Sequence, residues 1–448
     1  MSSTITPTSI ESTTVVTEDK NKKGDPFIWG IYISLILISI IECFSASSRE
    51  ISGAGMDMYR PIMRHCIMLV MGFVLLFLIQ RTDYKKFTPW IALFALATLL
   101  SMVTVQLIGD YINGAKRSFT LPGIGFSIQP AEMAKLSIVT LIAWFTARNQ
   151  MVKGVTNRGV TLCAIFVLIY CAFIFLQGLT NTMLLMGISF SMMLIGGVQK
   201  RKIVIVILVY ALAAGLFFFI KNINDEKKEN LRTEITAMNE YGEDTIIIDE
   251  KDDKAGRGNT WEQRLRRFFT GPDLIDQEMN GKNSQEMYAR IAQAHGGITG
   301  VGPGNSRECS RLPLAFSDYI YSIIIEELGL IGGVVVLALF LLLIARAKMI
   351  AKKCSRAFPA LLIMGMAVMI TLQAFFHMGI NTGLFPVSGQ PLPLISMGGT
   401  SILMVSIAFG VMLSVSRYAV QNNKIKEVKA EIRELPEDLR AENPYQSN

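Results

Sequence analysis

The chain has 448 residues, of which 51% are hydrophobic and only 18% are charged, and its mean hydropathy is +0.40. A soluble protein of this length needs more charge to cover its surface, so the composition excludes an ordinary soluble domain. The net charge of +7 does not indicate nucleic-acid binding, because the cations lie in short loops between apolar runs.

Ten apolar runs approach the roughly 20 residues that a helix needs to cross a bilayer. They predict an all-α polytopic membrane protein with about ten transmembrane helices. The runs cover residues 27–47, 65–80, 88–108, 129–147, 159–176, 181–198, 203–220, 319–345, 357–376 and 398–418. The predicted parts are a disordered N-terminal tail (1–26), helices 1–7 (27–220), a long loop (221–318), helices 8–10 (319–418) and a C-terminal tail (419–448).

Lysine and arginine clusters occupy alternate loops. They lie before the first run and after the second, fourth, sixth and eighth, at 20–23, 81–86, 148–158, 200–202 and 346–356. Because cytoplasmic loops carry an excess of cations, we expect both tails to be cytoplasmic and the long loop between helices 7 and 8 to be extracytoplasmic. In that loop, residues 225–254 form an acid-rich insertion. Residues 261–269 form a basic and aromatic stretch suited either to a membrane interface or to packing on the protein.

The fourth run begins with a polar constellation. Gln129, Glu132 and Lys135 are spaced by three and share one face of a helix that starts at Pro130. An acid and a base on one intramembrane face can form a structural ion pair or can bind a polar headgroup or pyrophosphate. Two cations just outside the helix, Lys116 and Arg117, either lie on the surface or favour an anionic lipid substrate.

A glycine-rich loop, 300–306, leads into the eighth run through Asp318. Gly302, Gly304 and Ser306 are candidate substrate-binding residues, because the glycines permit positive φ and their amides can face phosphate oxygens. A carboxylate at a helix mouth predicts either a general base or a helix N-cap. Deeper in the same run, one of the two acids at 326 and 327 is expected to line a cavity, and Glu326 is the candidate.

Residues 377–401 are rich in proline and glycine although they lie in an apolar region. Irregular backbone at membrane depth is tolerated only where it is buried in protein or lines a wet cavity. The segment is therefore either a structural re-entrant hairpin or part of a site, and Ser396, Gly398 and Gly399 are its candidate substrate-binding residues. No CxxC pair or histidine cluster predicts a metal site, and the glycines at 300–304 follow no strand, so they are not a nucleotide fingerprint.

These three segments resemble the signatures of the SEDS family (shape, elongation, division and sporulation), the FtsW/RodA glycosyltransferases. The matching stretches are 113–117, 129–136, 300–329 and 383–401, and order and spacing agree over roughly residues 30–418. The resemblance implies a ten-span enzyme of the cytoplasmic (inner) membrane that polymerises undecaprenyl-linked lipid II on the outer face. It assigns Asp318 as the catalytic base.

The same resemblance implies roles for other residues and for partners. Lys116, Arg117 and Lys135 would neutralise the pyrophosphate, and Glu132 would position Lys135. A divalent cation, Mg²⁺ or Mn²⁺, could assist the leaving pyrophosphate, although no ligand set in the sequence requires one. The implied partners are a class B penicillin-binding protein transpeptidase and divisome proteins. Ser45 and Ser47 after the first run, together with the Q-P-A-E spelling, favour the FtsW-like division member.

Two departures from the family pattern keep alternatives open. Ser118 stands where the family usually has Trp, and the acid expected near Leu179 is missing. The rival hypotheses are a lipid II flippase, a RodA-like elongation polymerase and a catalytically weak scaffold for a transpeptidase.

Overall fold

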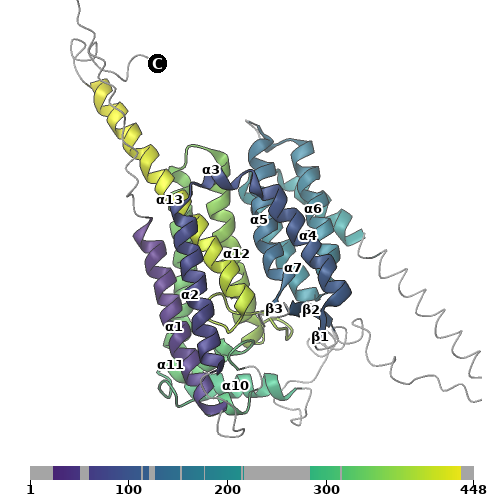
Figure 1. Ribbon diagram of the computed structural model, residues 1–448, viewed down its shortest axis with the longest axis vertical. Coiled ribbons are helices and arrows are strands. Elements are labelled where there is room, and N and C mark those ends of the chain that lie inside the picture. The colour runs from purple at the N-terminus through teal and green to yellow at the C-terminus, as the bar shows by residue number, and fades with distance from the viewer. Residues whose placement is uncertain are drawn as a thin grey trace, which may run out of the picture.

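The computed structural model describes residues 24–50, 60–112, 115–120, 127–151, 154–175, 177–212, 215, 283–312 and 315–434. The predicted N-terminal tail, most of the 221–318 loop with its acidic and basic stretches, and the end of the C-terminal tail lie outside these residues. The described chain is a helical bundle (Figure 1).

The bundle confirms the predicted all-α membrane architecture. Its helices are α1 (Pro26–Glu50), α2 (Arg60–Arg81), the short α3 (Tyr84–Phe87), α4 (Trp90–Ile108), α5 (Pro130–Arg148), α6 (Asn157–Phe175), α7 (Leu179–Ile195), a helix at 200–212, α10 (Ser284–Gly296), α11 (Ile320–Lys353), α12 (Ala357–Asn381) and α13 (Gly399–Glu434). Seven of those described are long and apolar enough to cross a membrane: α1, α2, α4, α6, α11, α12 and α13. Helices α5 and α7 and the described part of the seventh run, 200–212, lie at the remaining three predicted spans; residues 216–220 of that run lie outside the described residues.

Two small β-elements lie at opposite ends of the bundle, and the sequence predicted neither. Strands β1 (Asp110–Ile112), β2 (Ala115–Thr120) and β3 (Ser127–Ile128) form an antiparallel sheet between α4 and α5. Strands β4 (Gln150–Met151) and β5 (Gly154–Val155) form a hairpin between α5 and α6. Strands of two to six residues give too little alternation of polar and apolar side chains to be detected in a sequence.

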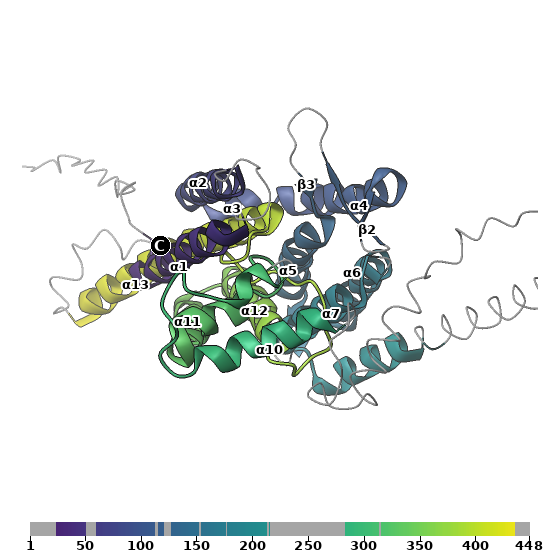
Figure 2. The ribbon, with the colours of Figure 1, turned by 90° about the horizontal axis from the view of Figure 1, so that it is seen from below.

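Helix α12 forms the centre of the bundle. It packs on α5, α7, α11 and α13, and 72% of its most apolar window is buried, against 22% for α2. Figure 1 shows α12 between one group containing α1, α2, α11 and α13 and another containing α4 to α7. Seen from the end that carries the three-stranded sheet, α10 lies across α11 and α12 (Figure 2). The polar residues of α5 and α12 are thus inside the protein rather than facing lipid.

Helix α11 is broken at Gly329, where the sequence predicted a continuous span. Gly329 has φ 72° and ψ −175°, which separates a short segment, 320–328, from the long segment that follows. A Cβ at Gly329 would lie 2.2 Å from the carbonyl oxygen of Ile298, so only glycine fits this contact with the 300–306 loop. The break fixes where the glycine loop meets the membrane helix.

Candidate active site at the start of α11

Asp318 lies in the turn that leads into α11, and it does not cap that helix. The N-cap residue is Tyr319, which makes no side-chain capping hydrogen bond, and the first-turn amide of Ser322 donates to Asn381 Oδ1 at 3.3 Å. The side chain of Asp318 is half-buried, and Ser317 Oγ donates a hydrogen bond to Asp318 Oδ1 at 3.1 Å. The N-cap alternative therefore does not account for the carboxylate.

The backbone at Asp318 is held by Asn381, the last residue of α12. Asn381 Nδ2 donates to the carbonyl oxygen of Asp318 at 3.0 Å, and its Oδ1 accepts from the Oγ of Ser322 at 3.0 Å. Asn381 is 2% exposed, so both bonds lie inside the protein. A buried amide that satisfies two segments at once fixes the position of the turn that carries the carboxylate.

The proline-rich loop, 386–398, packs against the same turn. Ser396 Oγ donates to the carbonyl oxygen of Ser317 at 2.7 Å and accepts from the amide of Leu392 at 2.7 Å. A Cβ built on Gly389 would lie 2.8 Å from Asp318 Oδ2, so this glycine lets the loop approach the carboxylate closely. Ser396 is buried and stabilises the loop, whereas Gly398 and Gly399 lead into α13 and are partly exposed.

The Glu132–Lys135 pair reaches the same loop through a third residue. Lys135 Nζ lies 2.6 Å from Glu132 Oε1 and donates to Gln373 Oε1 at 2.7 Å. Gln373 Nε2 in turn donates to the carbonyl oxygen of Pro391 at 3.1 Å. Glu132 and Lys135 are 4% and 2% exposed, so the structure shows a buried ion pair joined to the 386–398 loop. Their contact with a substrate stays a prediction.

Lys116 and Arg117 lie on β2. Lys116 Nζ donates to the carbonyl oxygens of Gln106 and Leu107 at 3.0 and 3.1 Å, so it caps the C-terminal end of α4. Neighbouring Ser118, which replaces the usual family Trp, is 3% exposed. The sheet reaches α5 at Gln129, whose amide donates to Thr400 Oγ1 at 3.2 Å, so β2, α5 and α13 meet at this end of the bundle.

The glycine loop adopts the predicted backbone but uses its amides internally. Gly300, Gly302 and Gly304 have φ of 78°, 92° and 78°. The amide of Gly302 donates to the carbonyl oxygen of Glu327 at 2.9 Å, and that of Gly304 donates to Ser45 Oγ at 3.0 Å. In this conformation the Gly302 amide binds α11 beside its break and the Gly304 amide binds α1, so both are used within the protein.

Both acids of α11 are buried. The sequence predicted that Glu326 lines a cavity, but in this conformation its side chain is enclosed by protein. Glu326 accepts hydrogen bonds from Ser306 Oγ and from the amide of Arg307, and it lies 2.9 Å from His295 Nδ1. Glu327 accepts from Ser45 Oγ. Glu326, Glu327 and Ser306 are at most 1% exposed. They tie α1, α10 and the glycine loop to α11, and their contact with a substrate stays a prediction.

The polar face of α12 was missed by the sequence reasoning. Gln373, His377 and Asn381 follow one another at intervals of four, and each contacts the site: His377 Nδ1 lies 2.6 Å from the carbonyl oxygen of Gln390. Gln390 Nε2 donates to Asn181 Oδ1 of α7 at 2.8 Å. Polar residues at helical spacing inside an apolar run were the available signal.

A family model described as cell cycle protein, FtsW/RodA/SpoVE, matches residues 26–251 and 252–421 of this chain. A probable peptidoglycan glycosyltransferase FtsW from Aromatoleum aromaticum is 28% identical over 89% of this chain and 89% of its own. Peptidoglycan glycosyltransferase MrdB from Escherichia coli K12 is 26% identical over 89% of this chain and 97% of its own.

Two solved structures share the fold. A chain from a peptidoglycan synthase complex, solved to show how polymerization and crosslinking are coordinated, superposes with a TM-score of 0.60. It is 22% identical and covers 89% of this chain and 99% of its own. RodA, the rod shape determining protein of Thermus thermophilus, gives a TM-score of 0.57 at 20% identity, covering 88% of this chain and 97% of its own.

Proposed function

Because this chain belongs to the FtsW/RodA/SpoVE family of cell cycle proteins, the SEDS family, we propose that it is a peptidoglycan glycosyltransferase that polymerises lipid II during septal wall synthesis. The observation that carries the proposal is the placement of Asp318. Its turn is held by Asn381 on one side and by the 386–398 loop on the other. A carboxylate positioned by two rigid elements is suited to act as a general base.

In the proposed reaction, Asp318 takes the proton from the attacking sugar hydroxyl of the acceptor. The hydroxyl oxygen forms a new bond to the anomeric carbon of the donor as the bond to undecaprenyl pyrophosphate breaks. The configuration at that carbon inverts, and the pyrophosphate leaves with the bonding electrons. Lys135, with Lys116 and Arg117, would stabilise the negative charge of the leaving group.

The residues present do not form a complete site for a divalent metal ion. Among the described residues, no three His, Cys, Asp or Glu side chains lie together closely enough to hold one. An Mg²⁺ or Mn²⁺ ion would therefore take most of its ligands from the substrate, whose pyrophosphate oxygens are hard donors. The steps assigned above depend only on the side chains of this chain.

The proposed location is the cytoplasmic membrane, with both termini in the cytoplasm and Asp318 on the outer face. The cationic loops support this orientation, because cytoplasmic loops carry an excess of cations. Four of the five clusters lie in loops between spans, the fifth precedes the first span, and all of them fall on the face opposite Asp318. Likeness to a chain from a peptidoglycan synthase complex supports a partner in wall synthesis. We propose that this partner is a class B penicillin-binding protein and that divisome proteins join the complex. Elongation remains the second candidate role, since similar proteins include both FtsW and MrdB.

The test is polymerisation of purified lipid II by the purified protein, with and without a class B transpeptidase. We expect glycan strands from the wild type and none from Asp318→Asn, at unchanged thermal stability. Asp83→Asn is the matched control, because Asp83 is 65% exposed at the other end of the bundle. Activity in Asp318→Asn equal to wild type would refute the proposed base. An inactive wild type that binds its transpeptidase would favour the scaffold hypothesis instead.

A further inference from the structure

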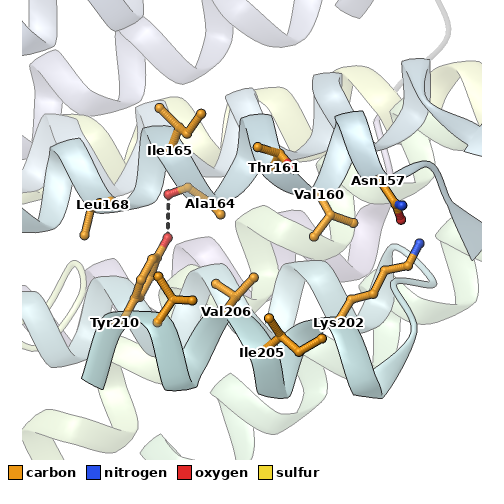
Figure 3. A pocket seen from close by; sticks show the side chains of 11 residues that line it. Asn157, Val160, Thr161, Ala164, Ile165, Leu168, Lys202, Ile205, Val206 and Tyr210 are labelled. Carbon is orange, nitrogen blue, oxygen red and sulfur yellow. Dashed lines mark hydrogen bonds between the residues drawn. The ribbon is translucent and has the colours of Figure 1, made fainter. Parts of the chain in front are cut away.

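A groove runs between α6 and the 200–212 helix (Figure 3), and no residue of the candidate active site lines it. Its volume is about 510 Å³, within the range of about 300–1,000 Å³ of ligand sites. Most of its wall is aliphatic, including Val160, Ile165, Leu168, Ile205 and Val206. Side chains on both sides point into the space between the two helices (Figure 3).

Hydrogen bonds hold the 200–212 helix at both ends of the groove, to α6 at one end and to β5, just before α6, at the other. At one end, the hydroxyl of Tyr210 donates to the carbonyl oxygen of Ala164. At the other end, Lys202 Nζ donates to the carbonyl oxygen of Val155 at 3.0 Å. The eight residue-to-residue steps from Lys202 to Tyr210 span about 12 Å at 1.5 Å per step. The groove is therefore a short slot with an aromatic end and a cationic end.

The cationic end has no acid near it in the sequence. From residue 133 to residue 224 the chain contains no Asp or Glu, whereas Arg158, Lys200, Arg201 and Lys202 all fall at this end of the two helices. Arg158, Lys200 and Arg201 are exposed. Clustered cations beside a membrane attract anionic lipid headgroups by about 1 kcal/mol each.

The cationic end of the groove lies at the end of the bundle opposite Asp318. Helix α5 has 19 residues and is about 28 Å long. Glu132 lies at the start of α5, and its ion-pair partner Lys135 is joined through Gln373 to the 386–398 loop beside Asp318. Asn149 follows the other end of α5, and its carbonyl oxygen accepts a hydrogen bond from the amide of Thr156, just before α6. The cationic end of the groove is thus at the far side of the bilayer from the candidate active site.

We propose that this groove binds an acyl chain of an anionic phospholipid, with the lipid phosphate at Lys202. A transmembrane helix of a partner is too wide, because a 12 Å length of helix about 10 Å across occupies on the order of 900 Å³. An acyl chain is narrow and apolar and matches the slot, and lysine carries its charge to the headgroup level at the end of an apolar stem. The proposal does not depend on the proposed glycosyltransferase reaction.

The test is native mass spectrometry of the full-length protein, purified in detergent and supplemented with phosphatidylglycerol or phosphatidylethanolamine. Ile205→Trp would fill the groove, and Val204→Trp is its control, because Val204 is its neighbour, is similarly exposed (53% against 59%) and does not line the groove. Lys202→Gln removes the charge at the groove, and Lys200→Gln removes a neighbouring charge outside it.

We expect wild type to retain phosphatidylglycerol in preference to phosphatidylethanolamine. Ile205→Trp should retain at least threefold less phosphatidylglycerol, with Val204→Trp unchanged, and Lys202→Gln should lose the preference that Lys200→Gln keeps. Equal retention by all four variants would overturn the proposal, as would equal retention of the two lipids by wild type. Thermal unfolding of each variant checks that it is folded, and both tryptophans replace exposed side chains.

Discussion

Asn381 shows how one buried side chain can organise a site without providing its chemistry. Its amide nitrogen donates to Asp318 and also to the carbonyl oxygen of His377, its own helix neighbour, at 2.9 Å. Its backbone carbonyl accepts from Gln293 Nε2 of α10 at 2.7 Å. Asn381 thus joins the end of α12 to α10 and to the turn before α11, which makes it a positioning residue for Asp318.

We expect Asn381→Ala to lower kcat for lipid II polymerisation at least tenfold while KM changes less than threefold. The variant frees the Asp318 turn, and it leaves buried groups unsatisfied at a cost of about 1–3 kcal/mol. Asn305→Ala is the control, since Asn305 is exposed and bonds only within the glycine loop. A purely structural role would lower the amount of folded protein but leave kcat per folded molecule unchanged.

The buried Glu132–Lys135 pair allows the structural and functional hypotheses to be separated. Removing one partner leaves a buried charge and costs about 3–5 kcal/mol. We therefore expect Lys135→Met to unfold at lower temperature than wild type and to be inactive. The double variant Glu132→Gln, Lys135→Met should recover most of the thermal stability but not polymerisation. Recovery of activity in the double variant would show that the pair is structural only.

At the scale of elements, the sequence predicted the spans well and their interruptions poorly. The ten apolar runs correspond to ten helices because hydrophobicity over about 20 residues is a strong signal. The break at Gly329 was missed, because it depends on the approach of Ile298, which is distant in the sequence. The same holds for the site: Glu132 and Lys135 could be paired by spacing, but Gln373 joins them to Pro391 only in the folded protein.

Two glycines with the same φ test the importance of this break. Gly300→Ala should yield little folded protein, because its Cβ would lie 2.2 Å from the carbonyl oxygen of Glu327. Gly304 has the same φ of 78°, but nothing lies within 4 Å of its Cβ position. Gly304→Ala should therefore cost only the backbone strain, about 1–2 kcal/mol. Thermal unfolding of the two variants measures the difference, and equal melting temperatures would mean that the glycine loop does not hold the break.

At the scale of the whole molecule, the polar network and the cationic loops lie at opposite ends of the bundle. The three-stranded sheet and α10 occupy one end and α3 occupies the other (Figure 1); Asp318 precedes the start of α11, which packs on α10. The membrane orientation therefore decides whether the site meets a substrate outside or inside the cell. A polymerase of extracellular glycan requires Asp318 outside.

Single cysteines at the two ends of the long part of α11 decide the orientation. The 23 residues from Leu330 to Lys352 span about 34 Å, enough to cross the hydrocarbon core of about 30 Å. Asn305→Cys, beside the helix break, should react with a membrane-impermeant maleimide in intact cells, and Lys352→Cys should react only after the cells are opened.

The native cysteines are expected to add little to the maleimide labelling. Burial raises the pKa of the Cys354 thiol to about 11, so little of this neighbour of Lys352 is in the reactive thiolate form at neutral pH. Cys66 is the other cysteine that is only partly buried, and Cys66→Ser removes it. Labelling of Lys352→Cys in intact cells, with none at Asn305→Cys, would place Asp318 in the cytoplasm. The site would then be on the wrong side of the membrane for glycan synthesis, and the proposed function would fail even if the fold and the site geometry stand.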